Sequence, residues 1–181
     1  MMRDTMTEFD LRALGWVVTR DAFWEIARSL VGQKPRIPLA AMPELSQRWR
    51  ALQAVAAKPS RPIRARIHLS SSVRGVSAET HAAAVDYLHV LRASCPDLYA
   101  PHIVVERCRR ALALAIAGFG GAIALGSLTD LDYPLISDAA LVLFLMGAWH
   151  LVTLFQLGSV RKLVSHYADQ TRLSGSPSTF P

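Results

Sequence analysis

The sequence predicts a mostly α-helical protein organised around a two-helix transmembrane hairpin. Apolar runs without a charged residue cover 111–129 and 139–160, and only a short acidic turn separates them. At about 1.5 Å of rise per residue, these runs form helices of roughly 28 and 33 Å, which match a hydrocarbon core about 30 Å thick. The polar and basic segment 1–100 precedes them, and it predicts a small helical cytoplasmic domain.

A helix pair buried in a soluble core is the alternative interpretation of the two runs. The chain has 181 residues, of which 51% are hydrophobic, and a formal net charge of +6. Charge-free runs of this length are uncommon in so small a domain, which favours the membrane. Residues 1–18 lack the apolar core of a signal peptide, because Glu8, Asp10 and Arg12 interrupt them. We therefore expect the hairpin itself to direct insertion.

Helical signals begin near the N-terminus. Thr7 and Asp10 have the spacing of a capping box, and apolar residues at helical spacing follow: Leu11, Leu14 and Val18. A second apolar stripe ends at a glycine suited to a C-terminal cap: Phe23, Ile26, Ala27, Leu30 and Gly32. The pattern fits either one bent helix or two.

The segment from Pro43 to Pro59 predicts a helix, with the first proline in its opening turn and the second at its end. Residues 63–69 then alternate apolar and basic side chains, which is the pattern of a strand. A partner strand would have to come from 73–76, from 103–105 or from another chain. We therefore expect at most one or two short strands in the 1–100 domain.

The next helix is predicted from a cap at Ser77 to about Ser94, with one apolar stripe: Ala84, Tyr87, Leu88 and Leu91. A turn is expected over 96–100, and Pro101 can begin a helix that continues into the first apolar run. Helical spacing also continues beyond the second run. The hairpin with its cytoplasmic extensions is therefore predicted over 101–172, and the Ser- and Pro-containing segment 173–181 is predicted to be a disordered tail.

Charges next to the two apolar runs predict the orientation. Basic residues precede the first run and follow the second: Arg107, Arg109, Arg110, Arg161 and Lys162. The connecting segment 130–138 holds three aspartates and no Lys or Arg. Lys and Arg near helix ends are retained in the cytoplasm. We therefore expect a two-span protein of a bacterial-type inner membrane, with both termini cytoplasmic.

Small residues in the first run predict close helix packing. They recur every four residues in two rows, one of Gly118, Ala122 and Gly126, the other of Ala113, Ala117 and Gly121. Small residues at this spacing let a second helix approach closely, which drives association in lipid. The partner helix can belong to the same chain or to another subunit.

His150 and Thr153 are polar residues within the second run. An ionisable group near the middle of a bilayer is a candidate functional site, because burying it without a partner is costly. One interpretation is a neutral imidazole bonded to a backbone carbonyl or to Thr153; others are a partner or pore contact, or a haem ligand. The first run contains no histidine for paired haem ligation, so we expect no cofactor.

A basic surface is predicted between Glu44 and Glu79, where no acidic residue occurs and seven basic ones do: Arg48, Arg50, Lys58, Arg61, Arg64, Arg66 and Arg74. Beside the inner leaflet, such charges attract anionic lipid headgroups. An acidic partner protein or a merely solvated surface are the other interpretations. Nucleic acid is disfavoured, because Trp49 is the only aromatic residue nearby for base stacking.

Catalytic and metal-binding motifs are missing from the sequence. Cys95, His102 and Cys108 lie near one another but lack a recognised ligand spacing, so no metal site is predicted. We expect a non-enzymatic interaction or accessory subunit of a larger membrane assembly, whose partners are lipid and other membrane subunits or further copies of itself. The alternatives are a homo-oligomeric two-helix pore or effector with a cytoplasmic sensing domain, and a redox or proton-handling subunit that uses His150.

Overall fold

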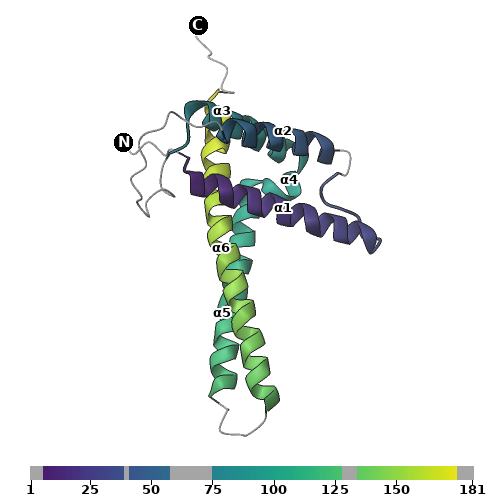
Figure 1. The fold of residues 1–181 in the computed structure, drawn as a ribbon, viewed down its shortest axis with the longest axis vertical. Helices are drawn as coiled ribbons and strands as arrows, with labels where there is room; N and C mark the ends of the chain where they lie inside the picture. The colour runs from purple at the N-terminus through teal and green to yellow at the C-terminus, as the bar shows by residue number, and fades with distance from the viewer. Residues whose placement is uncertain (1–5, 39–40, 58–74, 128–133, 175–181) are drawn as a thin grey trace.

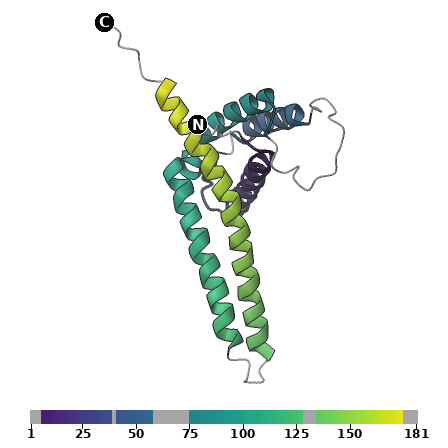
Figure 2. The same ribbon diagram turned by 90° about the vertical axis from the view of Figure 1, so that its left-hand side faces the viewer.

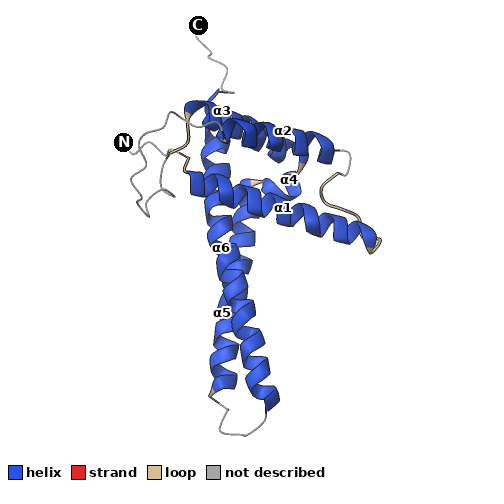
Figure 3. Ribbon diagram, in the orientation of Figure 1, coloured by secondary structure: helices blue, strands red, loops and turns tan. Residues whose placement is uncertain are grey.

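The structure, a computed structural model, describes residues 6–38, 41–57, 75–127 and 134–174. In these segments all of the named elements are α-helices, which agrees with the prediction of a mostly α-helical protein (Figure 3). An isolated bridge joins Thr7 to Gly75 there, and the predicted strand at 63–69 lies outside the described residues. The helices are α1 (Glu8–Leu30), α2 (Met42–Ala56), α3 (Ala78–Ser94), α4 (Pro96–Tyr99), α5 (Pro101–Gly126) and α6 (Pro134–Ser174).

Two long helices, α5 and α6, pack side by side as an antiparallel hairpin, and the other helices gather at one end of it (Figure 1). We call this group of α1 to α4 the head. Helix α1 runs crosswise to the hairpin, and α2 and α3 lie beyond it, away from the hairpin's turn (Figures 1 and 2). The C-terminal part of α6 rises into the head, so both ends of the chain's helical part lie at the same end of the hairpin.

Helix α1 begins at the predicted capping box. The Thr7 hydroxyl accepts a hydrogen bond from the Asp10 amide at 3.2 Å, and the Thr7 amide donates to the Asp10 carboxylate at 3.0 Å. The helix then continues for 23 residues as a single element. It ends where predicted, because Gly32 takes a φ of 79°, a left-handed conformation in which glycine is favoured.

Helices α2 and α3 also follow the sequence signals. Pro43 stands in the first turn of α2, and the Ser77 hydroxyl caps α3 by accepting from the Thr80 amide. The predicted stripe on α3 is buried: Ala84, Tyr87, Leu88 and Leu91. One expectation was wrong, because 96–100 is not a simple turn: Pro96–Tyr99 forms a one-turn helix, α4, that buries Leu98 and Tyr99.

Helices α5 and α6 are both long and apolar enough to cross a membrane. Helix α5 begins at Pro101, about three turns before the apolar run, and α6 continues past the second run to Ser174. The predicted extension of both helices beyond the apolar runs is therefore confirmed. Small residues on α5 let the two helices approach closely: Ala111, Ala115 and Gly118 are buried. A Cβ atom added to Gly118 would lie 2.7 Å from the Gly147 Cα, so the two backbones are almost in contact there.

One hydrophobic core joins the head to the hairpin. Its fully buried members include Leu14 of α1, Leu52 of α2 and Val104 of α5, together with Leu157 and Val160 of α6. The apolar character of the second run near residue 160 is therefore explained by packing inside the protein. The predicted segments 1–100 and 101–172 share this core.

Candidate functional site

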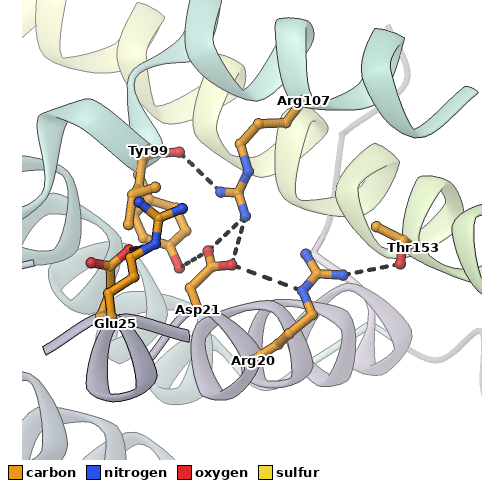
Figure 4. Close-up of polar contacts among 8 residues, drawn as sticks. Arg20, Asp21, Glu25, Tyr99, Arg107 and Thr153 are labelled. Atoms are coloured by element: carbon orange, nitrogen blue, oxygen red, sulfur yellow. Dashed lines mark hydrogen bonds and ion pairs between the residues drawn. The ribbon is translucent and has the colours of Figure 1, made fainter. Parts of the chain in front are cut away.

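A cluster of charged and polar side chains fixes α1 across the hairpin (Figure 4). Arg107 of α5 donates from Nη2 to both carboxylate oxygens of Asp21, at 2.6 and 2.8 Å. The Tyr99 hydroxyl of α4 donates to Asp21 Oδ2 at 2.8 Å. Arg20 of α1 donates from Nη1 to Thr153 Oγ1 of α6 at 3.1 Å, and its Nε lies 3.8 Å from Asp21 Oδ1. We call these five residues the junction cluster.

Asp21 and Tyr99, at the centre of the junction cluster, are buried, whereas Arg20, Arg107 and Thr153 are half-buried. Burial affects the protonation of the cluster. Asp21 is 6% exposed and Tyr99 is fully buried. Burial raises the pKa of the Tyr99 phenol well above its ordinary value, and the adjacent Asp21 carboxylate raises it further, both as a charge and as a hydrogen-bond acceptor. Burial also lowers the pKa of the Arg20 guanidinium, while the Asp21 charge opposes that shift. Tyr99 therefore remains a neutral donor at physiological pH.

A second buried acid, Glu25, holds the chain that leaves α1. It is 3% exposed and accepts a hydrogen bond from the Arg36 amide at 2.6 Å. The Arg28 guanidinium lies 3.9 Å from its other oxygen. The chain after Gly32 is thereby folded back along the helix.

The acids Asp21 and Glu25 face inward, and the apolar stripe predicted beside them faces outward. Phe23 is 64% exposed and Leu30 is 83% exposed. This inversion was not predicted, because an acid next to an apolar stripe normally marks the solvent side of a helix. A spacing of seven residues continues the stripe along the helix, through Phe9, Trp16, Phe23 and Leu30, but an apolar spacing alone does not distinguish an exposed stripe from a buried one.

The predicted orientation residues have different surroundings. Arg107 belongs to the junction cluster, so Asp21 already balances its charge. Arg110 is exposed and pairs with Glu106 one turn away, and Arg109 is exposed beside it. Arg161 and Lys162 are exposed on the part of α6 that lies in the head.

The basic surface is described only in part. Arg48 pairs with Glu44 at 3.2 Å and with Asp86 of α3 at 2.6 Å, so it joins α2 to α3. Arg50 is exposed. The remaining members lie outside the described residues: Lys58, Arg61, Arg64, Arg66 and Arg74.

Some of the small residues in the two predicted rows face α6, and others are exposed. Gly118 faces α6, and a Cβ on Gly121 would lie 3.0 Å from the Leu143 side chain of α6. Ala122 is half-buried, whereas Gly126 is exposed. Ala113 and Ala117 are exposed, so α6 does not cover that side of α5.

His150 and Thr153 lie near the level at which α1 crosses the hairpin. Thr153 belongs to the junction cluster, where its hydroxyl accepts a hydrogen bond from Arg20. His150 is half-buried and lies only one turn from that cluster. The head covers the end of the second apolar run, where Leu157 and Val160 are buried.

Cys95 and Cys108 are free thiols buried within the protein. Among the described residues, no group of three or more His, Cys, Asp or Glu side chains is placed to hold a metal ion. Burial, the largest effect, raises the pKa of Cys95 to about 11, and the nearby carboxylates of Asp21 and Glu25 act in the same direction.

The molecule thus combines a crosswise helical head, a hairpin and a buried charged cluster between them. No family model, no curated protein and no solved structure matches the chain.

Proposed function

We propose that this chain is a non-enzymatic two-span membrane protein, an interaction or accessory subunit whose head stands on the cytoplasmic side. The observation that carries the proposal is the distribution of exposed apolar side chains. Beyond the level of the junction cluster, the hairpin exposes large apolar residues around its outer surface, on both helices: Leu112, Ile116, Ile123, Leu141, Val142, Phe144, Leu145 and Trp149. Such a surface is far more apolar than that of a typical soluble monomer.

The length of the projecting hairpin matches a bilayer. From Arg107 the helix α5 continues for 19 residues to Gly126, which is roughly 28 Å at about 1.5 Å per residue. From Thr153 back to Ile136, α6 spans 17 residues, or roughly 26 Å. A hydrocarbon core is about 30 Å thick. We therefore assign the spans to about 107–126 and 136–153, with the remainder of α6 in the head.

Charge supports the proposed orientation. The head and the C-terminal part of α6 lie at the same end of the hairpin, so a two-span hairpin leaves both on the same side of a membrane. Arg109 and Arg110 are exposed at that end, whereas Asp138 is exposed near the opposite end. The positive-inside rule then favours a cytoplasmic head, close to anionic headgroups.

An uncovered strip of small residues on α5 supports the interaction role. Ala113, Ala117, Gly120 and Ala124 are all exposed. A Cβ placed on Gly120 would meet no atom within 4 Å, so another helix has room to approach. Close packing of this kind is how helices associate in lipid.

Purification in mild detergent tests this role. We expect the tagged chain to bring down unrelated membrane subunits in a fixed ratio, and the pair Ala113→Leu and Ala117→Leu to abolish the association. Ala139→Leu is the matched control, because Ala139 is an exposed small residue on the other helix. Recovery of further copies of the chain alone would replace the accessory role with the homo-oligomeric pore. Recovery of a lone monomer would contradict both.

A further inference from the structure

Helix α1 has an exposed apolar face that no other part of the described chain covers. Phe9, Trp16, Phe23 and Leu30 are 51%, 67%, 64% and 83% exposed. Seven residues make about two helical turns, so these four side chains lie along one side of the helix. We call this side the outer face of α1.

The acidic residues of α1 do not contribute charge to the outer face. Asp10, Asp21 and Glu25 are between 3% and 6% exposed, and Glu8 pairs with Arg12 at 2.6 Å. Lys34, just beyond the helix, is exposed and basic, whereas Arg36 lies on the inward side that carries Glu25. The outer face is therefore apolar, without an unpaired acidic residue and with a basic residue near its end, as in helices that lie on anionic membranes.

The position of α1 is also that of an interfacial helix. It runs crosswise to the hairpin, and its contacts with Arg107 and Thr153 place it where the projecting part of the hairpin begins (Figures 1 and 4). On α6, Phe155 and Trp149 on either side of Thr153 are 64% and 63% exposed. The apolar surface of the hairpin therefore reaches the level at which α1 crosses it.

We propose that α1 lies in the plane of the cytoplasmic leaflet, with its outer face at the boundary between anionic headgroups and acyl chains. This inference rests on the proposed two-span hairpin, which fixes the level of the bilayer. Trp16 and Trp24 suit this depth, because indole rings prefer the membrane interface. The junction cluster then holds α1 at the depth of the headgroup boundary, and the buried acids are kept away from the lipid.

The four tryptophans provide a direct test, since they lie on three elements: Trp16 and Trp24 on α1, Trp49 on α2 and Trp149 on α6. Variants that keep one tryptophan and replace the other three with Phe are reconstituted singly into nanodiscs of anionic lipid. The lipid carries bromine, a quencher, either near the headgroup or near the chain end. We expect Trp16 and Trp24 to lose about half of their emission with the shallow quencher, as for side chains roughly 5–10 Å below the headgroups. The deep quencher should affect them much less.

The other two tryptophans separate the possible failures. Trp149 should be quenched if the hairpin spans the bilayer, and Trp49 should not be quenched, because α2 lies on the far side of α1. An unquenched Trp149 would contradict the two-span hairpin itself. Quenching of Trp149 without quenching of Trp16 and Trp24 would overturn only the placement of α1.

A variant that adds charge to the outer face tests the placement of α1 without disturbing the fold. Phe23→Glu with Leu30→Glu changes two exposed side chains, so thermal stability in detergent should be unchanged, whereas the shallow quenching of Trp24 should fall to the level of Trp49. If Trp16 and Trp24 are quenched in discs that hold one copy of the chain but not in discs that hold several, a second chain covers the outer face. That result would overturn the lipid assignment.

Discussion

Arg107 Nη2 lies 2.6 Å from Asp21 Oδ1 and 2.8 Å from Asp21 Oδ2, and this ion pair joins a helix of the head to the hairpin. The two residues are 86 positions apart in the chain. Tyr99 and Thr153 extend the same cluster to α4 and α6. The orientation of the head on the hairpin is therefore set by charge as well as by apolar packing.

Removing one member of this pair should strongly destabilise the protein. Asp21→Ala leaves the mostly buried Arg107 without its partner, and Arg107→Ala leaves a buried carboxylate; each should cost about 3 kcal/mol. The midpoint of unfolding in a detergent titration measures this. Arg110→Ala is the control, because its exposed pair with Glu106 should contribute less than about 1 kcal/mol. In the double variant Asp21→Leu with Arg107→Leu, the loss in free energy of unfolding should be smaller than the sum of the losses in the two single variants. A loss equal to that sum would contradict the pairing.

Tyr99 should make the head sensitive to alkali. Because its pKa is raised in the folded protein, the folded state holds the phenol proton more tightly than the unfolded chain does. This stabilisation is fully present below the ordinary pKa of about 10 and is lost as the pH rises above it. Tyr99→Phe should cost about 1.5–3 kcal/mol at neutral pH, because the lost hydrogen bond goes to a carboxylate, and should flatten the decline at high pH. Unfolding midpoints between neutral pH and strongly alkaline pH test this, and an equally steep decline in the variant would contradict it.

Gly118 should tolerate no side chain. An added Cβ would lie 2.7 Å from the Gly147 amide nitrogen and 2.8 Å from the Leu143 carbonyl oxygen, so the helices would have to separate. Gly118→Ala should therefore destabilise the hairpin by about 1–3 kcal/mol. Gly120→Ala is the matched control, since nothing lies within 4 Å of its position. Equal thermal stability of the two variants in detergent would exclude the close contact of α5 with α6.

Cys95 should resist alkylation while the protein is folded. The side chain is fully buried, and a pKa of about 11 leaves on the order of one thiolate in a thousand at pH 8. In a Cys108→Ala background, modification by a maleimide should be at least about a hundredfold slower than in denaturant. Mass spectrometry of timed samples gives the rate. Fast labelling of the native protein would show that the head opens readily at α3 and α4.

Local signals in the sequence predicted much of the fold. The capping box at Thr7 and the cap at Ser77 depend on residues three positions apart, and the apolar runs depend on composition alone. Each could therefore be predicted without knowledge of the rest of the chain. The junction cluster could not be predicted in this way. Asp21 looks like a surface residue, because its partners Tyr99 and Arg107 are distant in sequence and only the tertiary fold brings them together.

The same reason explains why Arg107 was interpreted only as an orientation charge and Thr153 only as an intramembrane residue. Their positions in the apolar or basic pattern were correctly identified, but the pattern contains no information about which helix crosses them. The burial of Leu157 and Val160 in the head could not be predicted for a related reason. Their apolar composition does not distinguish them from the rest of the second run.

Labelling of single cysteines in intact cells tests the two-span hairpin most directly. In a background of Cys95→Ala and Cys108→Ala, cysteine replaces Ser127, which is exposed at the end of α5 just beyond the first span, or Ser46, which is exposed on the head. A membrane-impermeant maleimide should label Ser127→Cys from outside, and should label Ser46→Cys only after the cells are permeabilised. Labelling of Ser46→Cys in intact cells, or protection of both sites until permeabilisation, would contradict a hairpin that crosses the membrane with a cytoplasmic head.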